Sequence, residues 1–203
     1  MKQQVIGIHG GDLFETYEEY LDYLRAYELD LEKLKRRKWL DSLQDALGKD
    51  FEVITPVMPN KRNARYLEWK IWFDKLLPYV EADVILVGSS LGGIFLAKYL
   101  AENKFPKKVS ATFLVAAPYD KEGTGQILMD FVLPDSLDLL AEQGGKIFIY
   151  HSKDDPVVPF ADAEKYQQAL PSATLRVFED KGHFNQEELA ELVKEIANLR
   201  LIS

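Results

Sequence analysis

The sequence contains no cysteine and only three histidines among its 203 residues. Without cysteine, a disulfide-stapled scaffold, thiol catalysis and cysteine-ligated zinc are excluded. Basic side chains are also in the minority, since 25 Lys and Arg against 33 Asp and Glu give a net charge of −8. Because clustered cations drive binding to phosphate backbones and anionic membranes, we expect neither nucleic acid nor a membrane as partner.

Long hydrophobic runs are absent as well. The first apolar stretch, residues 5–8, is far too short for the core of a signal peptide or for a membrane span. We therefore expect a protein that is made and kept in the cytoplasm. A chain of this length buries roughly 70% of the surface that its unfolded form exposes. Residues 1–203 are thus predicted to form one domain that needs no structural metal.

Short apolar runs alternate with longer amphipathic stretches along the chain. The runs lack the polar alternation of a one-sided sheet, which is typical of strands buried on both faces. Alternation of strand and helix predicts an α/β fold, a three-layer sandwich with a mostly parallel sheet of about six strands and helices on both faces. The predicted strands are 5–8, 51–55, 84–87, 109–115, 146–150 and 174–178, and the predicted helices are 16–47 with breaks, 65–77, 91–102, 161–169 and 185–199.

Two connections are longer than a minimal crossover. One is a helical insertion around 15–47, in which Thr16 and Glu19 have capping-box spacing. It also holds the basic run 33–38, which we interpret as a solvated helix face rather than an anion-binding patch. The other is a small cap segment around 118–145, which contains the apolar run 127–133. The chain is expected to be a monomer or a homodimer, and an apolar insertion left exposed would favour the dimer.

A G-x-S-x-G motif, Gly88 to Gly92 with Ser90 at its centre, follows the third predicted strand and precedes a helical pattern. This context is that of a nucleophile elbow, where a tight reversal from strand to helix exposes the serine. A phosphate-binding glycine loop is disfavoured, because no Lys-Ser or Lys-Thr follows the motif. We therefore predict that Ser90 is a catalytic nucleophile.

A serine hydroxyl becomes a good nucleophile only when a base takes its proton. His183 follows the last predicted strand, at the same edge of the sheet as Ser90, and is the predicted base. The two other histidines, His9 and His151, also end strands, and we expect them to shape loops through hydrogen bonds. No pair of histidines has the spacing of a zinc site, and no cofactor or metal is expected.

The histidine needs a carboxylate that fixes its tautomer and stabilises the imidazolium. Asp155 is the predicted acid, since it follows the fifth strand and the proline after it holds it in extended backbone. The alternatives that remain open from sequence are Asp154, Asp120 and Asp180.

Acyl transfer also requires hydrogen-bond donors for the oxyanion. The backbone N–H of Leu91 is the first predicted donor, because it follows the nucleophile. The backbone N–H of Gly11, in the loop after the first strand, is the second. Gly10 and Gly11 could also serve only to form a tight turn, and the sequence does not distinguish the two roles.

These motifs, taken together, resemble those of the small, largely lidless serine hydrolases related to retinoblastoma-binding protein nine. The resemblance spans nearly the whole chain and implies a compact α/β-hydrolase with Ser90, Asp155 and His183 as its triad. Two departures stand out: Ser89 replaces a histidine that members often have, and the region 15–47 is more extended than the usual connection. The shared pieces are His9-Gly10, Pro56 to Asn60, Trp69 and Trp72, Leu86 to Gly92, Asp154 to Pro156 with Val158-Pro159, and Lys181 to Asn185.

The sequence thus predicts a serine hydrolase that cleaves an ester, or an activated amide or thioester, of a small substrate through an acyl-enzyme on Ser90. The alternative is a catalytically silent hydrolase-like module for protein interaction, with the two long connections as partner surface. Aromatic side chains are expected either to border an apolar substrate or to belong to the core: Phe14, Tyr17, Tyr119, Phe131 and Phe160.

Overall fold

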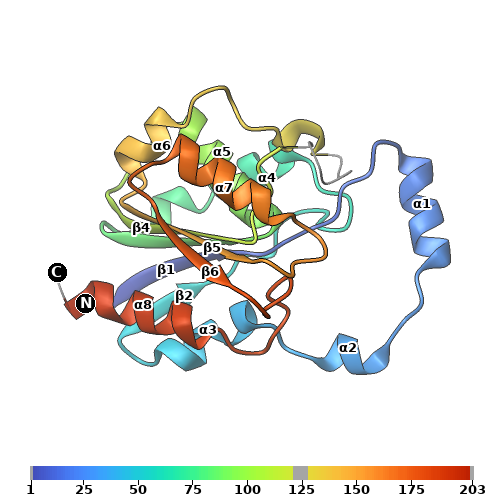
Figure 1. Cartoon of the computed structure of the whole chain (residues 1–203), viewed down its shortest axis with the longest axis horizontal. Coiled ribbons are helices and arrows are strands. Elements are labelled where there is room, and N and C mark those ends of the chain that lie inside the picture. The colour runs from blue at the N-terminus through green and yellow to red at the C-terminus, as the bar shows by residue number, and fades with distance from the viewer. Residues whose placement is uncertain (1, 121–127, 202–203) are drawn as a thin grey trace.

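The computed structural model describes residues 2–120 and 128–201 and contains a six-stranded sheet (Figure 1). All neighbouring strands in it are parallel, in the order β2-β1-β3-β4-β5-β6. The predicted α/β fold class is confirmed, and the sheet is fully rather than mostly parallel. The strands are β1 (Gln3–Ile8), β2 (Phe51–Ile54), β3 (Val84–Ser89), β4 (Val109–Val115), β5 (Lys146–Ser152) and β6 (Thr174–Phe178).

Helices cover both faces of the sheet, which gives three layers (Figure 1). One face is covered by α4 (Tyr66–Asp74), α5 (Leu91–Glu102), α6 (Asp138–Gln143) and α7 (Phe160–Ala169), and the other by α3 (Trp39–Leu47) and α8 (Ala190–Leu201). Two short 3₁₀ turns, η1 (Leu77–Tyr79) and η2 (Met129–Phe131), join the first set, and α1 (Tyr17–Ala26) and α2 (Leu31–Lys35) lie beyond the edge of the sheet. No helix in the described ranges is long and apolar enough to cross a membrane.

Aromatic rings fill the core on the α4–α7 face. The Trp69 ring is fully buried and contacts Phe95 and Phe131 edge-on, with centroids 5.6 and 5.3 Å apart. Leu128 and Phe131 are therefore core residues, whereas Val132 of the same apolar run is 49% exposed. Residues 121–127 of the predicted cap segment lie outside the described residues.

The order of strands reverses between β1 and β3, which are neighbours although β2 comes between them in the chain. In an open parallel sheet, ligands bind beyond the carboxyl ends of the strands at such a point. The structure brings α5 very close to β1 here. A Cβ atom added to Gly92 would lie closer than 3.0 Å to the carbonyl groups of Ile8 and His9. Glycine at this position lets the helix begin directly beside the end of β1.

Two predicted helices end or begin elsewhere. The pattern over 16–47 forms three separate helices, of which α1 starts at the predicted capping box of Thr16 and Glu19. The last helix begins at Ala190 rather than at residue 185. The chain before it is held by other contacts: the Gln186 carbonyl accepts a hydrogen bond from the Trp39 N–H at 2.9 Å, and Leu189 is buried.

We predict that Gly92→Ala destabilises the protein by about 3 kcal/mol, because the methyl group meets rigid backbone on β1. Chemical denaturation of both proteins measures this difference. Gly48→Ala is the matched control: its added Cβ meets nothing within 4 Å, although φ is +76°. Because φ +76° with ψ −166° is a conformation that residues other than glycine rarely adopt, a backbone cost of about 1 to 2 kcal/mol is still expected there. Equal losses of unfolding free energy in the two variants would contradict the steric explanation.

Candidate active site

Ser90 lies in the turn between β3 and α5 with φ 53° and ψ −119°. This left-handed conformation is strained for a residue with a side chain, and it persists where the surroundings enforce it. Here the Ser90 N–H donates to the Val115 carbonyl at 2.8 Å, and Gly92 allows the close approach of α5. The predicted strand–turn–helix context of Ser90 is thus present.

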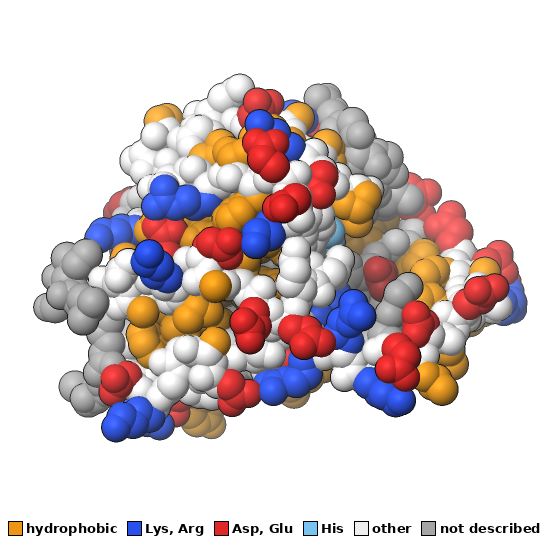
Figure 2. Space-filling model, turned by 60° about the horizontal axis from the view of Figure 1, so that its bottom comes forward, with side chains coloured by type: hydrophobic (Ala, Val, Ile, Leu, Met, Phe, Trp, Pro, Cys, Tyr) orange, Lys and Arg blue, Asp and Glu red, His pale blue; other side chains and the backbone are white. Residues whose placement is uncertain are grey.

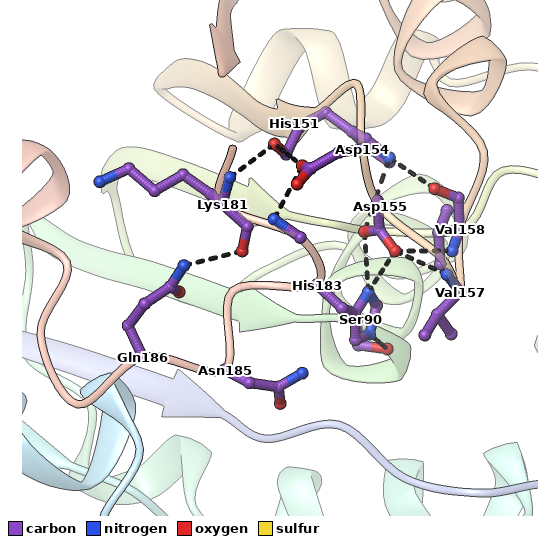
Figure 3. A network of polar contacts seen from close by, with 12 residues as sticks. Ser90, His151, Asp154, Asp155, Val157, Val158, Lys181, His183, Asn185 and Gln186 are labelled. Carbon is purple, nitrogen blue, oxygen red and sulfur yellow. Dashed lines mark hydrogen bonds and ion pairs between the residues drawn. The ribbon is translucent and has the colours of Figure 1, made fainter. Parts of the chain in front are cut away.

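The His183 ring bridges Ser90 and Asp155 (Figure 3). Its Nε2 lies 2.9 Å from Ser90 Oγ, and its Nδ1 lies 2.8 and 3.1 Å from the two Asp155 carboxylate oxygens. Because a carboxylate accepts only, Nδ1 carries the proton and Nε2 is free to accept from the serine hydroxyl. The Asp155 side chain is fully buried and His183 is 14% exposed. The structure therefore brings the three predicted residues together in one chain of hydrogen bonds.

Backbone donors hold the Asp155 carboxylate in place. Its Oδ1 accepts from the Val157 N–H at 2.8 Å and from the Val158 N–H at 3.0 Å. Among the alternatives left open by the sequence, Asp120 instead accepts from the Lys165 ammonium at 2.6 and 2.7 Å. Asp155 is the carboxylate that contacts His183.

The residues on both sides of His183 have positive φ, and the second of them is strained. Gly182 has φ +51°, and Phe184 has φ +50° although it carries a side chain. The Phe184 ring is buried and packs edge-on against Phe178 of β6 at 5.4 Å. Because strain of this kind persists only where packing over-determines it, the buried ring fixes the direction in which His183 points.

Asp154 and Ser152 tie the His183 loop to the Asp155 loop, a role that the sequence analysis missed (Figure 3). Ser152 Oγ donates to the Asp154 carboxylate at 2.5 Å and accepts from the Lys181 N–H at 2.9 Å. The same carboxylate accepts from the Gly182 N–H at 2.8 Å. Hydrogen bonds from Ser152 and Gly182 lower the pKa of Asp154, so it stays charged. The sequence shows the neighbouring carboxylates Asp154 and Asp155, but the residues of the other loop that they bind, Gly182 and His183, lie almost thirty residues further along the chain.

The two other histidines shape loops, as expected. His151 is buried, and its Nε2 donates to the Val158 carbonyl at 2.9 Å, beside the acid. His9 Nε2 accepts from the Met58 N–H at 2.9 Å, which ties the loop after β1 to the segment after β2. Burial lowers the pKa of His9 and of His151, so both rings are neutral near pH 7.

The two residues predicted to supply the oxyanion donors, Leu91 and Gly11, are neighbours in the structure. Leu91 is the first residue of α5, and the first N–H groups of a helix have no acceptor within it. Gly11 packs against Leu91, since a Cβ added to it would lie 3.1 Å from Leu91 Cδ2. The Asp12 N–H donates to the Lys61 carbonyl at 2.8 Å and fixes this loop. Among the described residues, no group of three or more Asp, Glu or His side chains is placed to hold a metal ion.

Comparison with known proteins identifies the family of this chain. The chain fits the family model described as serine hydrolase over residues 31–196. It is 26% identical over 157 residues to Serine hydrolase RBBP9 of Rattus norvegicus, which covers 73% of this chain and 78% of the rat protein. The resemblance predicted from the motifs is thereby confirmed.

Solved structures share the fold. The ydeN gene product of B. subtilis is 20% identical, with a TM-score of 0.79 over 98% of this chain and 100% of that one. A meta-cleavage product hydrolase from Pseudomonas fluorescens IP01 is 17% identical, with a TM-score of 0.64 over 98% and 91%. These likenesses show an α/β-hydrolase fold, and the family match over most of the sequence shows that the chain belongs to the serine hydrolase family.

Proposed function

We propose that this protein hydrolyses an ester, or an activated amide or thioester, of a small substrate through an acyl-enzyme on Ser90. The observation that carries the proposal is the His183 ring, hydrogen-bonded at once to Ser90 Oγ at 2.9 Å and to Asp155 at 2.8 Å. A base that touches both its nucleophile and its orienting carboxylate has the geometry of general-base catalysis.

In the first half-reaction, Ser90 Oγ forms a bond to the carbonyl carbon while its proton passes to His183 Nε2. The carbonyl electron pair moves to oxygen, where the N–H groups of Leu91 and Gly11 stabilise the charge. When the carbonyl re-forms, the bond to the leaving group breaks and the imidazolium gives it the proton. Buried Asp155 stabilises the transient positive charge on His183.

In the second half-reaction, His183 Nε2 takes a proton from water, and the water oxygen attacks the acyl carbon. Ser90 Oγ then leaves and recovers the proton from the imidazolium. The products are the carboxylic acid and the free enzyme. No step requires a group beyond the side chains and backbone N–H groups already named.

We predict that Ser90→Ala lowers kcat for p-nitrophenyl acetate by on the order of 10³-fold or more, with an unchanged circular dichroism spectrum. Ser89→Ala, one residue earlier, is the matched control and should keep nearly full activity. A fluorophosphonate probe should label the wild-type protein on the peptide that contains Ser90. A folded protein that resists the probe would favour the alternative of a catalytically silent interaction module.

The pH dependence of the reaction should report on His183. We expect kcat/KM to rise with pH to a plateau, because only the neutral imidazole can accept the proton of Ser90. The pKa of His9 and of His151 is lowered by burial, so protonation of those rings lies at the acid end of the profile. Stopped-flow or plate-based rates from about pH 5 to 8 measure the profile. A flat profile over that range would rule out His183 as the base.

Asp154→Ala should lower kcat by about 10-fold or more and leave KM within about twofold, because the His183 loop loses one of its tethers and shifts. Asp154→Asn retains an oxygen that can accept from the Gly182 N–H, so it should recover much of the loss. Lys153→Ala is the matched control on the same turn, since its ion pair with Glu179, at the start of the His183 loop, is exposed and contributes little. Full activity of Asp154→Ala would show that the tether is dispensable.

A further inference from the structure

Residues 15–38 form an arm that stands away from the three-layer body (Figure 1). It consists of α1, a short linker and α2, followed by the basic residues up to Lys38. None of the ten residues of α1 is buried. A helix shorter than about 12 to 15 residues is marginal in water unless an apolar face packs against something. To be stable, the helices of the arm therefore need an apolar surface against which they can pack.

The body covers one side of α1 only. Phe14 contacts the rings of Tyr20 and Tyr23 at 5.5 and 5.0 Å, and the Arg62 guanidinium lies 5.1 Å from the Tyr27 ring. Six large apolar side chains of the arm, Tyr27 among them, are nevertheless between 40% and 71% exposed: Tyr17, Leu24, Tyr27, Leu29, Leu31 and Leu34. Together they present on the order of 700 Å², close to the roughly 800 Å² that each partner contributes to a standard-size interface.

The charges of the arm are divided between its two halves. Residues 15–32 contain seven acidic residues and one basic residue, whereas residues 33–38 contain five basic residues and no acidic one. Acidic and hydrophobic side chains lie next to each other on the arm at the right of Figure 2. The exposed leucines Leu29 and Leu31 lie in the acidic half, close to the point where it meets the basic half. A surface with this layout is complementary to itself when it is turned by 180°.

We infer that the arm is a dimerisation element, in which two copies of the chain pair their arms antiparallel about a twofold axis near Leu29. In this arrangement α1 of one copy faces residues 35–38 of the other, so acidic side chains meet basic ones twice. A twofold interface requires such a self-complementary patch. The exposed leucines come together at its centre, where apolar contacts contribute most to binding.

The inference is tested by sedimentation velocity of the full chain at about 50 μM, where a dimer with a micromolar Kd is mostly assembled. Leu29→Asp with Leu31→Asp should raise the dimer Kd by about 100-fold and give monomers. Leu67→Asp with Ile71→Asp is the matched control, since these residues are equally exposed on α4, outside the arm. It should leave the dimer intact. A monomeric wild type, or a control that dissociates as readily, would overturn the inference.

Charge reversal distinguishes antiparallel pairing of the arms from non-specific hydrophobic association. Glu18→Lys with Asp22→Lys changes the net charge of α1 from −2 to +2, and Lys35→Glu with Arg36→Glu and Arg37→Glu changes that of residues 35–38 from +4 to −2. Each variant alone should be monomeric, because like charges then face each other. An equimolar mixture of the two should form heterodimers, which also shows that both variants are folded. Two variants that stay monomeric when mixed, or that dimerise separately, would contradict the antiparallel arrangement.

Discussion

The arrangement of the site depends on the contact between the start of α5 and the end of β1, where Gly92 meets the backbone of β1 directly. This contact leaves no room for a gradual connection from β3 into α5. The chain must reverse within one residue, and Ser90 takes the left-handed conformation that the reversal requires. The helix N-terminus and the loop after β1 are then side by side, so the nucleophile and the expected oxyanion donors come from one packing constraint.

The other half of the site is assembled from two loops at the end of β5 and β6. These strands are parallel neighbours, with Ser152 paired to Phe178 at the last position of the register. Parallel pairing brings the following loops to the same edge of the sheet. The pairing alone leaves the loops free to tilt, and the direct Asp155–His183 contact adds only one point of attachment. The hydrogen bonds of Ser152 and Asp154 to successive N–H groups of the other loop supply the further restraint.

Much of this architecture was predictable from the sequence, for identifiable physical reasons. The strands carry continuous apolar runs because both faces of the sheet are covered, and the glycines around Ser90 mark the close approach of α5 to the sheet. Asp155 was predicted from its place after β5 and before a proline, but the contact with His183 that distinguishes it from the other three carboxylates is set by tertiary structure. The amphipathic pattern of residues 17–26 predicted the helix correctly, but periodicity does not say what covers the apolar side chains. The delayed start of α8 likewise reflects a long-range contact, between Trp39 and Gln186.

Both ends of the arm are fixed to the body near the site. One end continues from the loop of Gly11 and Asp12, and at the other the Lys38 ammonium donates to the Asn185 side chain at 2.9 Å. The entropy of closing a loop between fixed ends grows slowly, by about 0.6 kcal/mol for each doubling of its length. The hydrolase body therefore tolerates a longer, shorter or differently folded segment at this point with little loss of stability. In evolutionary terms, this connection is where the chain can change its associations while its chemistry stays the same.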